Sequence, residues 1–518
     1  MNPQTQANRT RVEVAEQRLI VRGVYVGYIY LFSLGLSGFL MTPVMLSYLG
    51  QSAYGLWAAF NSIIGYLMLF NFGMNAASIK YTAEYRALTD QETLNKILSS
   101  VFVGLAILGL LIVLVSAGLS PLLPRVFAVP KDLVKAGSIA FMILGSTVGL
   151  RLVGSVFGNV IYGYQRVDVL KAFGIVQLVA NALFTVAFLH LGFGLIGVAL
   201  AVLLSFLMLT ALHLSYVRHS SPEIKIQPRL ASVRIFKQIA PYSIRSFFLG
   251  LTSQILYQTD SIIIGVFLGT ALVTPYAVAF TLLFTVKYLF TIIPETVFPR
   301  FSQLYTQGNM DELRRLYLRA TKIPIAIMVP VGLFLGFRGQ QFIGLWVGEE
   351  NFVGMDVLTV LIAMQFVHAY TGAGAVLLQG IGNNKGLTYS EMINAALNLL
   401  LSIILVRTMG VLGVALGTIA AHLMTSSWVV PLLACKQAKL PIHRYILSGI
   451  LPPVLAGIPA GAVMWVLARE LPFGNSFVDL GLKGLMVVAL YSVIYLAFAA
   501  TREERQMYFC LFKGIAGA

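Results

Sequence analysis

The sequence predicts an all-α polytopic membrane protein with about fourteen transmembrane helices, arranged as two parallel six-helix lobes followed by two further helices. Composition, an internal repeat and the distribution of cations lead to this prediction. Hydrophobic residues make up 58% and charged residues 11% of the 518 residues, and the mean hydropathy is +0.84. This balance is typical of chains that face lipid. At about 20 apolar residues per span, the expected span centres lie near residues 36, 64, 108, 146, 180, 205, 255, 286, 330, 367, 397, 423, 457 and 488.

An internal repeat relates the two halves of the chain. Residues 157–208 return as residues 373–424, and each copy contains two long apolar segments joined through a polar turn. The register is marked by GLIGVAL, which starts at Gly194, and GVLGVAL, which starts at Gly410. Repeats built from membrane helices are typical of secondary transporters, whose substrate site lies between the halves. The repeat therefore predicts transport across a bilayer, with lobes related by an axis along the membrane normal.

The repeat and the loops divide the chain into six expected parts. They are a cytoplasmic N-terminal segment (1–22), an N-lobe with spans one to six (23–217), a cytoplasmic linker (218–240), a C-lobe with spans seven to twelve (241–436), spans thirteen and fourteen (437–501) and a cytoplasmic tail (502–518).

The distribution of lysine and arginine predicts the topology. With the N-terminus in the cytoplasm, 26 of the 36 cations fall in cytoplasmic segments, against 7 on the opposite face and 3 within spans. Positive charge accumulates in cytoplasmic loops, so both termini are expected in the cytoplasm. The net charge of +16 is scattered over these loops without interleaved stacking aromatics. We therefore expect contact with membrane lipids and no nucleic-acid partner.

Motifs of soluble enzymes give no indication of a catalytic site. Residues 192–197 match the letters of the dinucleotide fingerprint, but the preceding strand and the following acidic residue that this motif needs are not predicted. The sequence contains neither a Walker lysine motif nor an HExxH pair. Its two cysteines, Cys435 and Cys510, offer neither a disulfide framework nor a metal cluster. We expect no catalytic residue, no metal site and no cofactor.

Ionisable residues at membrane depth are the strongest candidates for function, because each is costly in hydrocarbon and normally faces a cavity or a partner. Seven such residues occur: Arg151, Arg245, Asp260, Lys287, Glu295, Asp356 and Glu391. Lys287 and Asp260 lie in adjacent expected spans, so they either form a functional ion pair or simply pin two neighbouring helices. His368, near the middle of span ten, is the histidine most worth testing, although a lone histidine there is more often a packing residue.

Arg151 and Arg245 lie in the inner halves of spans four and seven. From opposite lobes they would both face a shared cleft, where guanidinium groups grip phosphate oxygens through paired hydrogen bonds. The alternative is that each side chain extends to the inner interface. Glu295, between Pro294 and Pro299, is expected at the inner mouth of span eight. Asp356 and Glu391 are close enough to span ends to favour placement at the interface.

Three segments resemble a known family. YLGQSAYGLW at residues 48–57, DSIIIGVFLG at 260–269 followed by YAVA at 276–279, and GIGNNK at 380–385 are similar to segments of the Wzx-type polysaccharide flippases. These belong to the multidrug/oligosaccharidyl-lipid/polysaccharide exporter superfamily, which also contains the multidrug and toxic-compound extruders (MATE). Together with the helix count, the resemblance covers nearly the whole chain.

The resemblance implies a V-shaped, MATE-like pair of lobes that translocates lipid-linked (undecaprenyl-pyrophosphate) oligosaccharide from the inner to the outer leaflet of the bacterial inner membrane. It implies alternating access coupled to a cation gradient or to the membrane potential. Capsule, exopolysaccharide or O-antigen biosynthesis would follow, with polysaccharide polymerase and chain-length machinery as possible partners. The first two spans contain no charged residue, whereas the related peptidoglycan-precursor flippases place cations there. This difference favours the second lobe as the place of the cationic site.

The sequence thus predicts a flippase, not an enzyme, with a provisional assignment of site residues. Arg151, Arg245 and Lys287 would attract the phosphates, and Asn61, Gln254 and Gln258 would offer polar contacts to the substrate. Asp260 and Glu295 would serve ion coupling. The alternatives are a cation-coupled multidrug or metabolite antiporter of the same fold and a membrane glycosyltransferase or polymerase. The latter usually needs a sizeable outer loop or soluble domain, for which the short outer loops leave no room.

Overall fold

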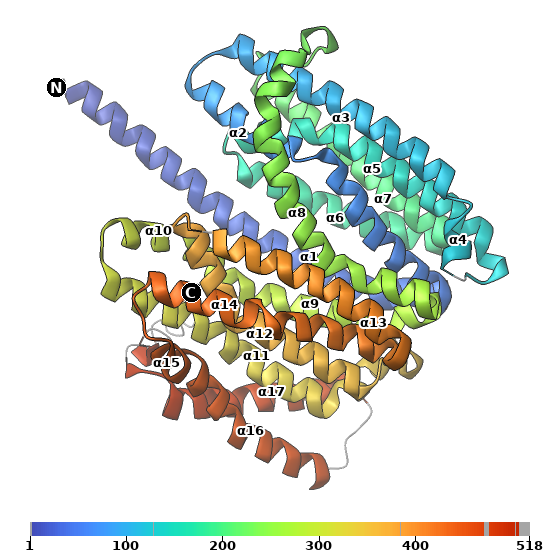
Figure 1. Ribbon diagram of the computed structural model, residues 1–518, viewed down its shortest axis with the longest axis vertical. Helices are drawn as coiled ribbons and strands as arrows, with labels where there is room; N and C mark the ends of the chain where they lie inside the picture. The colour runs from blue at the N-terminus through green and yellow to red at the C-terminus, as the bar shows by residue number, and fades with distance from the viewer. Residues whose placement is uncertain (1–2, 128, 384, 471–475, 503, 507–518) are drawn as a thin grey trace. The chain divides into compact units, whose positions relative to one another are not determined.

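The computed structural model is built of helices joined by short turns (Figure 1). It describes residues 3–127, 129–383, 385–470, 476–502 and 504–506, without the side chains of residues 3–21 and of some positions elsewhere, among them Arg245. The helices are α1 (Pro3–Met68), α2 (Met74–Ala87), α3 (Gln91–Leu119), α4 (Leu123–Val126), α5 (Val134–Gly163), α6 (Val167–His190), α7 (Gly194–Ser220), α8 (Val233–Leu268), α9 (Thr270–Thr296), α10 (Phe298–Thr306), α11 (Met310–Val347), α12 (Met355–Gly380), α13 (Lys385–Met424), α14 (Ser426–Gln437), α15 (Ile442–Tyr445), α16 (Leu451–Glu470) and α17 (Phe477–Ile494).

The described helices confirm the all-α membrane architecture. Eleven of them are long and apolar enough to cross a membrane. Two of these, Tyr25–Asn71 and Lys385–Gln437, each contain two expected spans. A further expected span coincides with α8, in which the shorter apolar segment Gln258–Leu268 is described. All expected span centres therefore fall within helices, and the protein is a multi-pass membrane protein.

Glycines separate the paired spans. Gly50 interrupts α1 with φ 71° and ψ 174°, and Gly269 ends α8 with nearly the same backbone, φ 91° and ψ 163°. Gly410 breaks α13 with φ 59°, at the position that the repeat aligns with Gly194, whose φ is 52°. Positive φ favours glycine because it has no Cβ. The two repeats therefore turn at equivalent residues.

Side-chain caps begin α3 and α11. The side chain of Asp90 accepts a hydrogen bond from the Thr93 N–H at 3.0 Å, and the side chain of Asn309 accepts one from the Glu312 N–H at 3.2 Å. Each cap satisfies a backbone donor that the first helical turn leaves free. The Thr93 N–H also holds the pKa of Asp90 below its usual range, because it favours the carboxylate.

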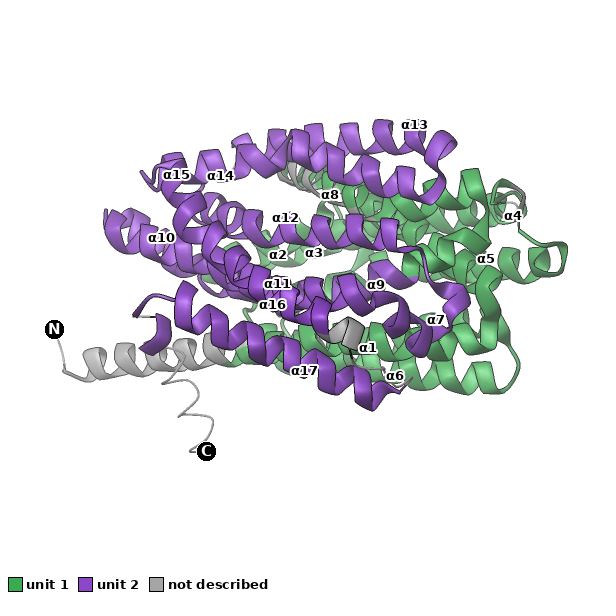
Figure 2. Cartoon of the chain, turned by 90° about the horizontal axis from the view of Figure 1, so that it is seen from below, with its two compact units in different colours: residues 1–277 green, residues 278–518 purple. Residues whose placement is uncertain are grey.

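Two compact units divide the chain, residues 1–277 and residues 278–518 (Figure 2). In the first unit α5 packs against α2, α3 and α7, while α8 packs against α1, α2 and α3. Helices α3 and α5 approach each other closely, since a Cβ on Gly109 would lie 2.5 Å from the Gly149 carbonyl oxygen. Small residues allow membrane helices this separation. The boundary between the two units, after Ala277, is defined by packing. It differs from the expected linker between the lobes at residues 218–240, and that expected division stays a prediction.

In the second unit α12 packs against α11, α13 and α14, and the two helices outside the repeat, α16 and α17, pack against α11. The rings of Tyr317 and Tyr445 stack with centroids 5.2 Å apart. The hydroxyl of Tyr445 also donates to the Tyr370 carbonyl oxygen at 2.6 Å. These contacts attach the start of span thirteen to α11 and α12.

A buried ion pair ties α11 to the segment that follows α17. Lys322 Nζ donates to Glu504 Oε2 at 2.8 Å and to the Ala499 carbonyl oxygen at 2.8 Å. The two charged side chains are 4% and 6% exposed. Thr501 N–H donates to the same Glu504 oxygen at 2.8 Å, and the Glu504 N–H donates to Thr501 Oγ1 at 3.3 Å, as in a capping box. We call this arrangement the Lys322–Glu504 clasp.

Replacing Glu504 by alanine should destabilise the protein markedly, because the ammonium group of Lys322 would remain buried without its counterion. Breaking a buried pair from one side costs about 3–5 kcal/mol. The measurement is thermal unfolding of the detergent-solubilised protein, followed by size-exclusion chromatography. Glu92→Ala is the control, since it removes an exposed pair with Lys96 of a kind that contributes at most about 0.5 kcal/mol. Equal melting points for the two variants would contradict a stabilising clasp.

Candidate functional site

A polar stripe follows one face of α5 in the first unit. Arg151, Ser155 and Asn159 recur at helical spacing, so their side chains lie above one another. Asn75 at the start of α2 joins them: its Oδ1 accepts from Ser155 Oγ at 2.8 Å and from Asn159 Nδ2 at 3.1 Å. The stripe places hydroxyl and amide groups next to a guanidinium group inside a membrane helix.

Arg151 itself lies among aromatic rings. Its Cζ is 5.6 Å from the centroid of the Phe206 ring of α7, and it interacts electrostatically with Tyr30 of α1. A second cation, Lys171 of α6, lies with Nζ 4.6 Å from the centroid of the same Tyr30 ring. Within the described part of the chain no carboxylate forms a salt bridge with Arg151. The Arg151 guanidinium group therefore contacts the face of the Phe206 ring, and no carboxylate among the described residues balances its charge.

Asp260 of α8 is buried, with 6% of its surface exposed. Its Oδ2 accepts a hydrogen bond from Tyr276 Oη at 2.5 Å. One residue earlier, Thr259 is hydrogen-bonded to Tyr66 of α1. A buried carboxylate has the chemistry of an ion-binding group, since carboxylates are hard oxygen ligands. Lys287 belongs to the second unit, and the ion pair predicted between it and Asp260 stays a prediction.

The predicted polar contacts in α1 and α8 belong to the first unit. Gln254 Nε2 donates to the Gly65 carbonyl oxygen at 2.6 Å, and Gln258 is half-buried beside Gly65. Asn61 is exposed and donates to the Trp57 carbonyl oxygen at 3.0 Å. The side chain of Arg245 lies outside the described residues, so its predicted role stays a prediction.

Lys287 of α9 faces a polar cluster in the second unit. Its Nζ is 5.2 Å from the centroid of the Phe284 ring, and it interacts electrostatically with His368 of α12 and with Glu391 and His422 of α13. The rings of His368 and His422 meet edge to face, with centroids 5.0 Å apart. Asn394 Nδ2 approaches His422 Nδ1 at 3.2 Å and Glu391 Oε2 at 3.5 Å. Glu295, two turns after Lys287 in α9, is exposed.

Sequence reasoning found some members of these clusters and missed others. It selected Arg151, Lys287 and His368, and it placed Glu391 at an interface, whereas the structure groups Glu391 with Asn394 and Lys287. The spacing of Arg151, Ser155 and Asn159 could have revealed the stripe on α5. The partners supplied by other helices are tertiary contacts without a local signal. They are Tyr30, Asn75, Lys171, Asn394 and His422.

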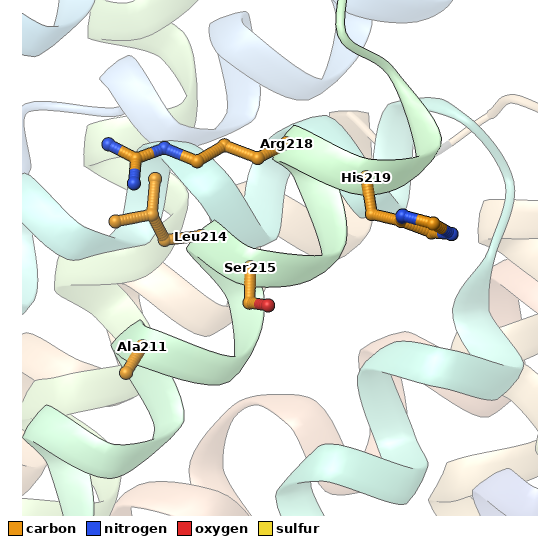
Figure 3. A pocket seen from close by; sticks show the side chains of 5 residues that line it. All are labelled: Ala211, Leu214, Ser215, Arg218 and His219. Atoms are coloured by element: carbon orange, nitrogen blue, oxygen red, sulfur yellow. The ribbon is translucent and has the colours of Figure 1, made fainter.

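A shallow hollow of about 420 Å³ lies at the end of α7, lined by Ala211, Leu214, Ser215, Arg218 and His219 (Figure 3). All five residues come from one helix, and the side chains of Arg218 and His219 extend in different directions (Figure 3). One helix cannot enclose a substrate. The polar groups inside the helical units are therefore better candidates for a transport site.

Comparison with known protein families shows to which family the chain belongs. The family model described as polysaccharide biosynthesis protein matches residues 44–352. The chain belongs to this family. The match includes Arg151, Asp260 and Lys287, and it confirms the resemblance to the Wzx-type polysaccharide flippases.

Individual relatives agree with the family assignment. The membrane protein EpsK of Bacillus subtilis is 20% identical over 510 residues, which cover 94% of this chain and 98% of that protein. A probable flippase of Haloferax volcanii, AglR, is 24% identical over 42% of this chain and 48% of its own length. Among solved structures, the inward closed form of the lipid II flippase MurJ has a TM-score of 0.72, with 17% identity, and the match covers 90% of this chain and 98% of that one. The structural likeness shows the fold.

Substituting Tyr276 by phenylalanine should lower stability by about 1–3 kcal/mol, the usual cost of removing a hydrogen-bond donor from a buried polar group. The affected group is the carboxylate of Asp260. Thermal unfolding in detergent provides the measurement. Tyr48→Phe is the matched control, because Tyr48 is 50% exposed. A melting point unchanged in Tyr276→Phe would show that this hydrogen bond does not stabilise the folded protein.

Proposed function

We propose that the protein translocates lipid-linked oligosaccharide, carried on undecaprenyl pyrophosphate, from the inner to the outer leaflet of the bacterial inner membrane. The observation that carries the proposal is the match to the polysaccharide biosynthesis family over residues 44–352, combined with the position of Arg151 inside a membrane helix, where no carboxylate of the described residues forms a salt bridge with it. The relative AglR, a probable flippase, supports the same activity. Capsule, exopolysaccharide and O-antigen are the polysaccharides that such a step would serve.

The cations would bind the pyrophosphate. Charged residues inside membrane segments mark substrate or ion pathways by default. Arg151 offers a planar donor fork that matches phosphate oxygens, and Lys287 offers a compact point charge. In this proposal Arg151, Arg245 and Lys287 act in turn on the same headgroup as access alternates between the two leaflets.

The uncharged polar groups would contact the sugars. Ser155 and Asn159 follow Arg151 on the same face of α5, and Asn75 of α2 is hydrogen-bonded to both, so sugars attached to a bound phosphate would reach them. Gln254, Gln258 and Asn61 extend the polar surface in α1 and α8. Amide and hydroxyl groups can both donate and accept hydrogen bonds, which suits sugar hydroxyls.

Transport requires a driving force and an orientation. We propose a cation gradient or the membrane potential as the driving force, with Asp260 and Glu295 as the ion-coupling groups.

The lysine and arginine distribution supports a cytoplasmic location of both termini. Polymerase and chain-length proteins are proposed neighbours, since translocated oligosaccharide is their substrate. The protein would act as a transporter and not as an enzyme.

An antiporter for cationic drugs or metabolites is the second candidate of the same fold. A cationic substrate would need a surplus of acids at its site, whereas Arg151 and Lys171 flank Tyr30 in the first unit. This surplus of positive charge favours an anionic substrate. Overproduction should therefore leave resistance to cationic compounds unchanged, and increased resistance would favour the antiporter.

Lys287→Ala should abolish export of lipid-linked oligosaccharide while folded protein remains in the membrane, because the substitution removes a charge-assisted contact of about 1.5–3 kcal/mol. The assay treats cells with a membrane-impermeant lectin or glycosidase and measures glycan in the outer leaflet. Lys287→Arg retains the charge and should keep part of the activity. Lys385→Ala, at an exposed position, serves as the control. Full export by Lys287→Ala would remove Lys287 from the site.

Arg151→Lys retains the positive charge, so charge alone predicts unchanged export. We expect export to fall nevertheless, since lysine cannot form the paired hydrogen bonds of a guanidinium group. A loss of roughly tenfold in initial rate corresponds to about 1.4 kcal/mol. The same leaflet assay, at equal protein levels, measures the rate. Arg218→Lys is the matched control, because Arg218 lies in the last turn of α7 and is exposed. Equal rates for both variants would show that paired hydrogen bonding at Arg151 is unimportant.

A further inference from the structure

Two arginines converge on one buried carboxylate at the N-terminal end of α6. Asp168, in the first turn of this helix, has only 2% of its side chain exposed. Arg166 donates to both of its oxygens, from Nε to Oδ1 at 3.0 Å and from Nη2 to Oδ2 at 3.2 Å. Nε of Arg22 in α1 lies 3.6 Å from Oδ2 of the same carboxylate. One negative charge therefore holds two guanidinium groups.

The two helices that carry these residues pack closely against each other. A Cβ on Gly23 would lie 3.5 Å from Cβ of Val167. Two turns further along α6, a Cβ on Gly174 would lie 2.7 Å from Cε2 of the Tyr30 ring. The ion pair between α1 and α6 is therefore part of a continuous contact between the helices.

The two arginines retain donors that Asp168 does not use. A guanidinium group carries five N–H donors. Arg166 directs Nε and Nη2 to the carboxylate, whereas Arg22 approaches it with Nε and has 70% of its side chain exposed. Among the described side chains, no second carboxylate forms an ion pair with either arginine. Two guanidinium groups and one carboxylate leave this cluster with a net charge of +1.

Both arginines lie at the depth of lipid headgroups. The apolar span of α1 begins at Tyr25 and that of α6 at Val167, so Arg22 and Arg166 come directly before the two spans. The headgroup region of a bilayer adjoins the ends of such spans. Tyr25 is 67% exposed, and tyrosines are enriched at this interface. The predicted topology places this end of both spans at the cytoplasmic leaflet, where anionic lipids attract basic residues.

We propose that Arg22 and Arg166 bind the phosphate group of an anionic phospholipid of the cytoplasmic leaflet, and that the bound lipid completes the anchor between α1 and α6. The non-bridging oxygens of a phosphodiester accept hydrogen bonds from guanidinium groups. A second anion also reduces the repulsion between two cations that share one carboxylate. This lipid is a resident ligand of the protein and does not depend on the proposed function.

The charge of the cluster favours a single phosphodiester over other phosphate groups. A phosphodiester such as that of phosphatidylglycerol carries one negative charge, which balances the net charge of +1. A diphosphate between lipid and sugar carries two and would leave an excess negative charge. A zwitterionic phospholipid brings its own cation, which the arginines would repel. An anionic phospholipid is therefore the occupant that the cluster fits.

Native mass spectrometry of the full-length protein in detergent tests the site, because it counts bound lipids and measures their affinity. The probes are phosphatidylglycerol, phosphatidylcholine and farnesyl diphosphate, each titrated separately. Arg22→Gln and Arg166→Gln should each weaken the tightest phosphatidylglycerol binding about fivefold, the effect of one cation near a membrane surface. Arg229→Gln is the matched control, because it removes the same charge from an exposed position in the linker. It should bind phosphatidylglycerol as the wild type does.

Asp168→Asn should have the opposite effect. It removes the carboxylate that competes with the lipid for both arginines, so phosphatidylglycerol should bind several-fold more tightly. A cluster that only joins the two helices would lose stability in this variant without gaining lipid affinity. Thermal unfolding is the second readout: phosphatidylglycerol should raise the melting temperature of the wild type more than that of Arg22→Gln. If Asp168→Asn does not fold, the exposed Arg22 still provides this test.

Several outcomes would overturn the site. Equal affinity of the wild type, Arg22→Gln and Arg166→Gln for phosphatidylglycerol would remove the arginines from lipid binding. Equal binding of phosphatidylcholine would show that the charge of the lipid is not recognised. Arginine-dependent binding of farnesyl diphosphate alone would assign the cluster to the carried lipid and contradict a resident phospholipid. The leaflet assay measures export independently, so failure of this site leaves the proposed function standing.

Discussion

Hydrocarbon offers no hydrogen bonds, and the structure depends on this constraint throughout. Every backbone group at membrane depth must find its partner within the protein, which leaves the helix as the default conformation. Between spans the chain reverses at residues that tolerate positive φ, as Gly50 and Gly410 do. Side chains follow the same rule: threonine and serine hydroxyls donate to carbonyl oxygens one turn earlier, as Thr147 does to Ile143.

The same constraint explains why polar residues gather in groups. An isolated asparagine or arginine would be costly in lipid, but neighbours that satisfy one another make the group tolerable. The α5 stripe around Asn75 and the cluster around Asn394 are two such groups, one in each unit. Such a group is suited to binding because several helices contribute complementary polar atoms to it. A transported headgroup would replace some internal partners with its own oxygens.

The fold followed from the sequence to a large extent. Hydropathy located the spans because about 20 apolar residues are needed to cross a bilayer, and the repeat predicted equivalent turns at Gly194 and Gly410. Individual site residues were partly predictable: Arg151 and Lys287 stand out as charges in apolar segments. Their surroundings were not, because Lys171 near Tyr30 and His422 near His368 are contacts between helices that no local pattern encodes. Nor does any local pattern show that α11 continues through Lys322 and that the charge of this lysine is buried.

The Lys322–Glu504 clasp also orders events during synthesis. Glu504 lies 182 residues after Lys322 in the chain, so at roughly 5–20 residues per second the carboxylate leaves the ribosome about ten to forty seconds after the lysine. During that interval α11 has an ammonium group without its counterion and cannot adopt its final burial. Lys322 must stay near the membrane surface or be neutralised by lipid phosphate until the later segment arrives. Burial of Lys322 with its counterion therefore waits until the segment after α17 has been translated.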